Sequence, residues 1–155
     1  MSQQFLLGRL LGLDVGDVRI GVAVSNESGI VVTPHSVIRR KPEAAVLAHI
    51  MRIAEAETVA GIVVGLPLSL NGEYSDQTRS VTAFVERLAA QTTLPVVTWD
   101  ERYTTVEAER ILREQGVRRD RWREQIDAIA ATVILQDYLD AHLPPTVPSP
   151  DDQTS

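Results

Sequence analysis

The chain of 155 residues contains no cysteine, a single lysine and only three histidines. Without cysteine, neither a disulfide framework nor a thiolate metal site can form, and cysteine usage gives no indication of the redox compartment. The histidines, His35, His49 and His142, are scattered along the chain, which argues against a structural zinc site. The sequence therefore gives no sign of a fold built on disulfides or zinc.

Long hydrophobic runs are also missing. The stretch Gly61–Leu68 has the length of a strand and is too short to cross a bilayer. The first residues, Met-Ser-Gln-Gln, lack the basic and apolar regions of a signal peptide. Hydrophobic residues make up 44% and charged residues 23% of the chain, as in ordinary globular proteins. We expect one cytoplasmic domain without a membrane segment, long enough to bury a single core.

Positive charge is scarce in total but concentrated in places. The formal net charge of −6 argues against a general nucleic-acid coat protein, because phosphate binding needs clustered basic residues. However, residues 113–123 hold five arginines against two acids, and Arg39-Arg40-Lys41 forms a smaller basic cluster. Each cluster is either a solvated face or a phosphate-binding surface, and the charge pattern leaves both interpretations open.

Alternating apolar residues predict three strands in the first part of the chain. Arg9–Val15 and Arg19–Asn26 are β-rich and are separated by a Gly-containing turn, which is typical of a hairpin. Ile30–Ile38 is predicted to be a third strand. Pro34 lies within it and favours an edge position, because proline cannot donate a hydrogen bond to a neighbouring strand. The first three strands are therefore expected to be antiparallel.

The remaining sequence alternates helices with short buried strands. Continuous apolar runs predict two parallel strands, Val59–Leu66 and Leu94–Trp99. Helical spacing and capping residues predict four helices: one after Pro42, one capped by Ser75, one from Thr104 to Gly116, and one from Arg121 to Ala141. Thr104 and Glu107 have the spacing of a capping box, in which each side chain bonds the other's backbone amide.

This βββαβαβαα order predicts an α/β fold. Three antiparallel strands followed by two parallel ones would form a five-stranded mixed sheet with helices on both faces. The domain is predicted to span residues 1–143, and the Pro-rich acidic tail 144–155 to be disordered. Because ligands bind beyond the carboxyl ends of parallel strands, the pattern directs attention to Asp14, the loop after Leu66 and the segment Asp100-Glu101-Arg102.

Two acidic sites fall at strand ends. Asp14 lies between Gly12 and Gly16, which would let a phosphate or another backbone approach, although an aspartate here can equally stabilise its own turn. Glu101 follows a predicted strand, where a carboxylate is costly unless a cation or a hydrogen-bond donor compensates it. Arg102 either provides this compensation or binds a phosphate with its planar guanidinium group.

Asp127 is the third acid. On a helical wheel it shares one side with apolar residues such as Ala131 and Ile134, so its carboxylate needs a partner. Either further acids with a divalent cation, or an arginine such as Arg19 or Arg102, could be that partner. With Asp14 and Glu101 it forms a set of carboxylates, the ligands that Mg²⁺ and Mn²⁺ prefer. Two such ions can activate water and stabilise the leaving oxygen of a phosphodiester.

The chain also resembles a known family through motifs that lie in family order. They are Gly12-Leu-Asp-Val-Gly-Asp-Val-Arg-Ile-Gly-Val-Ala-Val-Ser25, Ile62-Val-Val-Gly-Leu-Pro-Leu68, Asn71-Gly72, Asp100-Glu-Arg-Tyr-Thr-Thr-Val-Glu-Ala108 and Ile126-Asp-Ala-Ile-Ala-Ala-Thr-Val-Ile-Leu-Gln-Asp-Tyr-Leu139. The resemblance is to the YqgF family, also called RuvX, of bacterial RNase H-fold proteins, which are described as pre-16S rRNA nucleases or as Holliday junction resolvase-like proteins.

The resemblance implies an RNase H-like fold and a catalytic set of Asp14, Glu101 and Asp127. The chain departs from the family pattern at Asn26, where many relatives carry aspartate, and at Gln125, where a lysine often precedes the last catalytic acid. Tyr103 replaces a commoner leucine. The missing lysine removes one phosphate contact, which Arg119, Arg121 or Arg123 could supply instead.

We therefore expect a nuclease that uses Mg²⁺ or Mn²⁺ and hydrolyses RNA, with the resemblance implying 5′-end processing of pre-16S rRNA. Asp14 would bridge the metals, and Arg19 and Arg102 would contact phosphate. The strand would be held by the basic segment and its aromatic residue: Arg113, Arg118, Arg119, Arg121, Trp122 and Arg123.

Three alternatives remain. A DNA junction resolvase could use the same site but would need a dimer, and the sequence does not determine the oligomeric state. A ribosome-assembly module could keep the fold without catalysis, although the intact acidic trio argues against this. An actin-like nucleotide binder would need two lobes, for which 155 residues are too few.

Overall fold

The computed structural model describes residues 8–102 and 104–142 of the chain. Its centre is one five-stranded sheet in the order β3-β2-β1-β4-β5. The strands are β1 (Leu10–Val15), β2 (Arg19–Ser25), β3 (Val32–Arg39), β4 (Gly61–Leu66) and β5 (Val96–Asp100). The pairs β1–β2 and β2–β3 are antiparallel, and β1–β4 and β4–β5 are parallel. The predicted mixed sheet is confirmed, including the edge position of the strand that contains Pro34.

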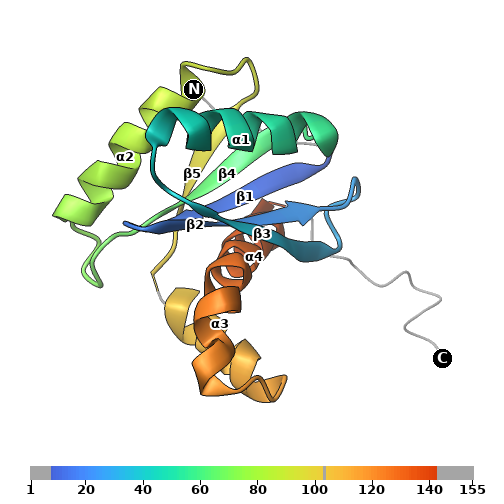
Figure 1. Ribbon diagram of the computed structural model, residues 1–155, viewed down its shortest axis with the longest axis vertical. Coiled ribbons are helices and arrows are strands. Elements are labelled where there is room, and N and C mark those ends of the chain that lie inside the picture. Colours follow the sequence, from blue (N-terminus) through green and yellow to red (C-terminus); the bar gives the residue numbers. More distant parts are fainter. Residues whose placement is uncertain (1–7, 103, 143–155) are drawn as a thin grey trace.

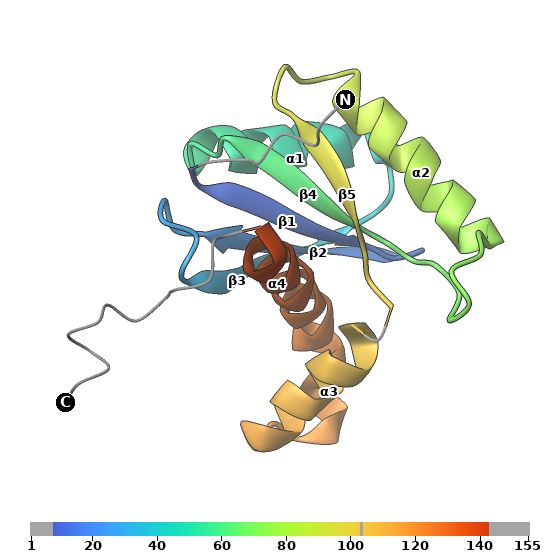
Figure 2. The ribbon, with the colours of Figure 1, turned by 180° about the vertical axis from the view of Figure 1, so that it is seen from behind.

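Helices cover both faces of this sheet, as predicted. They are α1 (Glu43–Ala56), α2 (Asp76–Ala89), α3 (Thr104–Glu114) and α4 (Trp122–His142), with a 3₁₀ turn at Arg119–Arg121. Helices α1 and α2 lie on one face and α4 on the other, while α3 packs on α4 and extends with it beyond the sheet (Figures 1 and 2). None of the helices described is long and apolar enough to span a membrane.

The central strand β1 is buried on both faces, which explains its nearly continuous apolar sequence. Leu11, Leu13 and Val15 belong to the core beneath α1 and α2. Leu10 belongs to a second core against α4. Because successive side chains of a strand point to opposite faces, Asp14 points to the α4 side with Leu10. The candidate acid of β1 therefore lies on the face that α4 covers.

Local signals account for most helix boundaries. The Ser75 Oγ accepts a hydrogen bond of 3.2 Å from the Thr78 amide, which confirms the predicted cap of α2. After α3, Gly116 has a φ of 72°, and the Val117 amide bonds the Leu112 carbonyl, an arrangement that glycine adopts without strain.

The predicted capping box at the start of α3 is wrong. Thr104 is the first residue of the helix, and its amide donates to the Glu101 carbonyl at 3.0 Å. The Glu107 carboxylate accepts hydrogen bonds from Arg110 instead, one turn further along. A charged donor within reach on the same helix face makes a stronger hydrogen bond with a carboxylate than a neutral amide does.

Three glycines allow α4 to approach the sheet closely. A Cβ atom placed on Gly21 would lie 1.8 Å from the Asp127 carbonyl oxygen. A Cβ on Gly12 would lie 2.8 Å from Leu135 Cβ, and one on Gly65 2.5 Å from Ile134 Cδ1. The α4 backbone therefore rests directly on β2, and any larger residue at position 21 would push Asp127 away from the sheet.

We expect Gly21→Ala to destabilise the fold by about 3 kcal/mol, at the upper end of typical overpacking costs, because the new methyl group overlaps main-chain atoms that cannot rotate away. Urea unfolding followed by circular dichroism measures this loss. Gly116→Ala is the control: no atom lies within 4 Å of its added Cβ, so only the positive φ is penalised, at about 1–2 kcal/mol. A Gly21→Ala protein at least as stable as the control would contradict the close-contact argument.

Candidate active site

Asp14 and Glu101 meet at the carboxyl edge of the parallel strands. Asp14 is the next-to-last residue of β1, and Glu101 directly follows β5, with β4 between the two strands. The Glu101 amide donates to the Leu66 carbonyl at 3.1 Å, which fixes the chain as it leaves β5. The side chains of Asp14 and Glu101 are hydrogen-bonded to each other. Two predicted site residues, distant in the sequence, therefore share one proton.

Gly65 makes room for this pair. A Cβ atom at this position would lie 2.9 Å from Glu101 Oε2 and 3.1 Å from its carboxyl carbon. The sequence-based prediction did not include Gly65 in the site. Its signal was present, since a glycine inside a continuous apolar strand often marks the close approach of another group.

Burial and mutual repulsion disfavour two negative charges here. Burial raises the pKa of Glu101 to about 9, with further increases from the charge of Asp14, the hydrogen bond to Asp14 and the charge of Asp100. Burial also raises the pKa of Asp14 to about 6, against the lowering effect of the hydrogen bond from Glu101, and the charge of Asp127 raises it further. At neutral pH the pair therefore retains a proton unless a cation replaces it.

Asp127 reaches the same edge from α4 but has an arginine partner. Arg19 Nε, at the start of β2, lies 2.7 Å from Asp127 Oδ2. The two side chains are 36% and 20% exposed, so this is a half-buried pair rather than a surface contact. Of the two arginines considered from the sequence, Arg19 is the one that pairs with Asp127. The carboxylate still lies near enough to raise the pKa of Asp14.

Two of the three candidate acids, Asp14 and Glu101, are placed so that their carboxylate oxygens could bind a hard divalent cation. Asp14 and Glu101 provide carboxylate oxygens, which Mg²⁺ and Mn²⁺ prefer, and their shared proton marks a position where positive charge is favourable. Across residues 8–102 and 104–142, no three histidine or acidic side chains are arranged to hold one ion. Asp127 would have to leave Arg19 to become a third ligand.

Arg102 connects the site to the loop after β4. Its Nε donates to Asp100 Oδ2 at 2.8 Å, and its Nη1 donates to the Leu70 carbonyl at 3.1 Å. This is the compensating role considered for Arg102 in the segment Asp100-Glu101-Arg102, and the acid that it contacts is Asp100. The arginine also fixes the path of residues 67–75 beside the carboxylates.

Trp122, at the start of α4, is packed into the turn between α3 and α4. Its indole N–H donates to the Val117 carbonyl at 2.9 Å, and it packs on the small core shared by the two helices. The guanidinium carbons of Arg113 and Arg119 lie 5.8 and 5.3 Å from its ring centroid. These contacts correspond to the anchoring role of an aromatic residue. Tyr103, which departs from the family pattern, lies outside the described residues.

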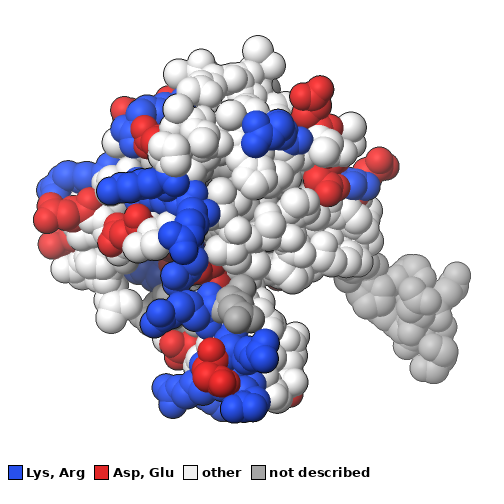
Figure 3. Space-filling model, in the orientation of Figure 1, with Lys and Arg blue, Asp and Glu red and all other residues white. Residues whose placement is uncertain are grey.

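Basic side chains form a band across one face of the molecule. Figure 3 shows this band running from the sheet region onto the part formed by α3 and α4. Near the sheet, Arg19 of β2 lies opposite Arg39 of β3 in the strand register. The Arg40 amide donates a hydrogen bond to the Val18 carbonyl. The smaller of the two basic clusters that the sequence showed therefore lies next to Arg19, the partner of Asp127. In the α3–α4 turn, Arg118 forms an ion pair of 3.4 Å with Asp120.

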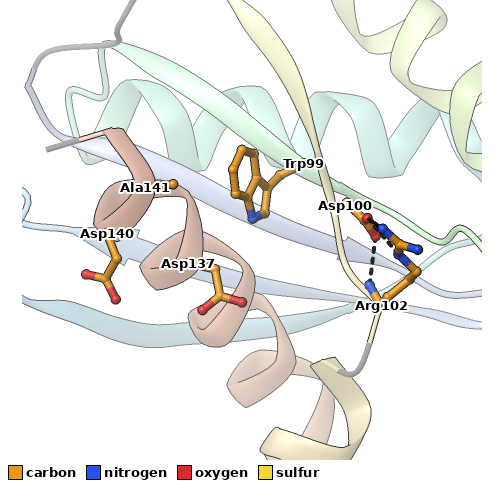
Figure 4. Close-up of a pocket in the computed structure, with 6 residues that line it drawn as sticks. All are labelled: Trp99, Asp100, Arg102, Asp137, Asp140 and Ala141. Atoms are coloured by element: carbon orange, nitrogen blue, oxygen red, sulfur yellow. Dashed lines mark hydrogen bonds and ion pairs between the residues drawn. The ribbon is translucent and has the colours of Figure 1, made fainter. Parts of the chain in front are cut away.

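A separate cavity of about 660 Å³ lies beside the site. Asp137 and Asp140 project into it from α4, and Asp100 and Arg102 from the end of β5 (Figure 4). Burial raises the pKa of Asp137, and the charge of Asp140 adds to this effect. Asp14, Glu101 and Asp127 are not among the lining residues. An acidic wall of this kind disfavours the binding of anions such as phosphate.

The sheet order, with a long helix bringing an acid to the carboxyl edge, defines the RNase H-like class of α/β proteins. Solved structures agree. A Thermus thermophilus RuvC bound to a Holliday junction substrate is 15% identical with a TM-score of 0.56, covering 86% of this chain and 94% of that one. A fowlpox virus Holliday junction resolvase is 10% identical with a TM-score of 0.55, covering 86% and 99%. At these identities the likeness concerns the fold alone.

The chain belongs to the RuvX family, whose model is described as "Holliday junction resolvase" and matches residues 8–141. A Chloroflexus aggregans relative is 45% identical, covering 88% of this chain and 96% of its own. A Symbiobacterium thermophilum relative is 48% identical, covering 86% and 92%. Both carry the name "Putative pre-16S rRNA nuclease". The family assignment made from the sequence motifs is confirmed.

We expect Glu101→Gln to change the pH dependence of stability in EDTA. The folded-state pKa values of Asp14 and Glu101 lie above the ordinary values of 3.8 and 4.5, at about 6 and 9. Between about pH 4 and 9 the folded protein therefore binds more protons than the unfolded chain. Its stability falls as pH rises through this window, by at most about 1.4 kcal/mol per pH unit for each extra proton.

The glutamine variant keeps a hydrogen-bonding group but removes one carboxylate, so its profile should be flatter and its stability at pH 8 higher than the parent's. Urea unfolding at several pH values measures both properties. Glu73→Gln, at an exposed position, is the control and should follow the parent. Parallel profiles for parent and Glu101→Gln would disprove the shared proton.

Proposed function

We propose that the protein is a divalent-metal-dependent nuclease that hydrolyses phosphodiester bonds in RNA. The observation that carries this proposal is the half-buried pair of Asp14 and Glu101, whose carboxyl groups are hydrogen-bonded to each other at the carboxyl edge of the sheet. Membership of the RuvX family and the names of the relatives support it. By analogy with those names, the substrate is the precursor of 16S rRNA.

Asp14, Glu101 and Asp127 would hold Mg²⁺ or Mn²⁺ when the enzyme is loaded. A bound ion of this kind makes water a stronger nucleophile and stabilises the oxygen that leaves the phosphodiester. Asp14 holds the central position, because it is hydrogen-bonded to Glu101 and electrostatically coupled to Asp127. The pair releases its shared proton when positive charge takes its place.

Arg19 has two roles in this proposal. In the metal-free protein it neutralises Asp127 through the 2.7 Å contact. If Asp127 also held a cation, the guanidinium group of Arg19 would be available to a phosphate oxygen, for which its planar geometry is suited. The same arginine thus stabilises the empty site and contacts the substrate in the loaded one.

The basic band would hold the sugar-phosphate backbone on both sides of the acids. Arg39 and Arg40 lie next to Arg19 on the sheet side. On the other side the α3–α4 turn contributes Arg113, Arg118, Arg119, Arg121 and Arg123. Arg102 remains a candidate phosphate contact, because it is 34% exposed while paired with Asp100.

A DNA junction resolvase is the second candidate. The family description, "Holliday junction resolvase", favours it, and the Thermus thermophilus RuvC of the same fold class is seen in complex with a Holliday junction substrate. Cutting a junction symmetrically requires two sites in a two-fold dimer, so this candidate predicts a stable dimer as well as junction cleavage. A comparison of substrates with the same protein preparation separates the two candidates.

The direct test is cleavage of single-stranded RNA, duplex DNA and a four-way DNA junction with Mg²⁺ or Mn²⁺. We expect RNA to be cut fastest. Asp14→Asn should reduce the rate at least about 100-fold, because it keeps the size of the side chain but removes charge that the metal requires. Asp17→Asn, at an exposed position three residues further on, is the control and should retain activity. Undiminished cleavage in excess EDTA would rule out metal dependence.

The arginines of the α3–α4 turn should act on binding rather than on the chemical step. Replacing Arg118 and Arg119 by Glu should weaken RNA affinity and reduce the slope of log affinity against log salt by about 1–2, because each lost phosphate contact releases about one ion fewer. The control, Arg52→Glu with Arg79→Glu, changes net charge equally but lies on α1 and α2. Equal effects of the two double variants would show that only net charge matters.

A further inference from the structure

Exposed apolar side chains gather around the carboxylate edge. In the described ranges, six large apolar side chains are strongly exposed: Val18, Ile30, Val31, Leu70, Tyr74 and Val106. Ile30 and Val31 lie in the turn between β2 and β3, at the other end of the sheet. The remaining four lie in segments that leave the edge where Asp14 and Glu101 meet. Isolated exposed apolar residues are normal, but a group beside a site indicates binding.

Leu70 and Tyr74 stand out because both belong to the loop between β4 and α2. Leu70 is 69% exposed and Tyr74 is 58% exposed. The loop begins after Leu66, whose carbonyl accepts from the Glu101 amide, and returns to Arg102, which donates to the Leu70 carbonyl. These two contacts attach the loop to Glu101 and to the residue that follows it, so the loop starts beside the acidic pair.

Hydrogen bonds fix the loop in place. The buried Thr78 side chain donates to the Pro67 carbonyl at the loop's start and caps the helix that begins at its end. Within the loop, the Ser69 amide donates to the Glu73 carbonyl at 3.0 Å, and the Glu73 amide donates back to Ser69 Oγ at 3.1 Å. A loop tied in this way presents its apolar side chains at little entropic cost on binding.

The surroundings indicate what these side chains bind. Lys and Arg side chains form a band on this face, and a single strand that lay along the band would carry one base on each of its sugars, free to contact the protein beside the backbone. An exposed tyrosine ring offers a flat face on which a base stacks regardless of its identity, and an exposed leucine in the same loop adds apolar surface. In a continuous duplex the faces of the bases are covered by their neighbours, and only an unpaired base can turn out onto such a surface.

We propose that Leu70 and Tyr74 form a base-binding site that holds an unpaired nucleobase next to the scissile phosphate. The site makes the enzyme selective for single-stranded or locally unpaired nucleic acid over a continuous duplex. This inference rests on the proposed nuclease function, because it uses the same strand path across Asp14 and Glu101.

The test measures binding in EDTA, so that cleavage does not enter. The probes are an oligoribonucleotide that contains one 2-aminopurine and the same strand in a full duplex. Leu70→Ser with Tyr74→Ser should weaken binding of the single strand by about tenfold, the effect expected from one lost stacking contact, and leave duplex binding unchanged. Ile30→Ser, which alters a side chain that is 72% exposed at the far end of the sheet, is the matched control and should bind as the parent does.

The fluorescence of 2-aminopurine reports stacking directly. Its intensity should fall when the parent binds the single strand and fall less with the double variant. Melting temperatures of parent and variants should agree, because both substitutions lie on exposed positions. Equal losses on both probes, or parent-like binding of the single strand by the double variant, would overturn the proposal.

The result that would contradict the nuclease proposal differs from the result that would contradict the base-binding site. If the parent cleaves no nucleic acid with Mg²⁺ or Mn²⁺ but the double variant loses single-strand binding, the base-binding site stands and the catalytic proposal falls. If the parent cleaves RNA and the double variant keeps the parent's preference for single strands, the catalytic proposal stands and the base-binding site is wrong.

Discussion

The contact between α4 and β2 at Gly21 is the constraint on which the site depends. The Asp127 carbonyl occupies the space that a side chain at position 21 would fill. This brings an acid from a helix near the end of the chain to within electrostatic reach of Asp14 on the first strand. Gly12 and Gly65 allow the same close packing further along α4. Because protein interiors are close-packed, a helix displaced by one methyl group would move the acid as well.

This packing concentrates negative charge, and the structure compensates it locally in two different ways. Burial raises the pKa values of Asp14 and Glu101, so that this hydrogen-bonded pair retains a proton, whereas Asp127 is paired with Arg19. Buried charges of one sign are unfavourable unless protons, arginines or cations balance them. In a metal-bound site, a divalent ion would replace both the proton of the Asp14–Glu101 pair and the positive charge of Arg19 beside Asp127. The stability of the empty protein and its readiness to bind metal are therefore set by the same few groups.

Much of the architecture could be predicted from local patterns. The apolar runs located the parallel strands, Pro34 indicated the edge strand, and Ser75 and Gly116 marked helix ends that the structure confirms. The predicted capping box at Thr104 was wrong because the pattern of residue types does not show which donors compete for the Glu107 carboxylate. Arg110 is a stronger donor for this carboxylate than the Thr104 amide. Gly65 was overlooked because its importance depends on Glu101, which follows a different strand.

By itself, the sequence determined the elements, their order, the family and the three candidate acids, because strand and helix periodicity and motif spacing are written along the chain. Only the tertiary structure decided the partners. In the structure, Asp14 is hydrogen-bonded to Glu101, and Asp127 forms its ion pair with Arg19. Arg102 donates a hydrogen bond to the loop that exposes Leu70 and Tyr74. The physical reason is that ion pairs and pKa shifts depend on distances and burial in three dimensions, which residue spacing along the chain does not specify.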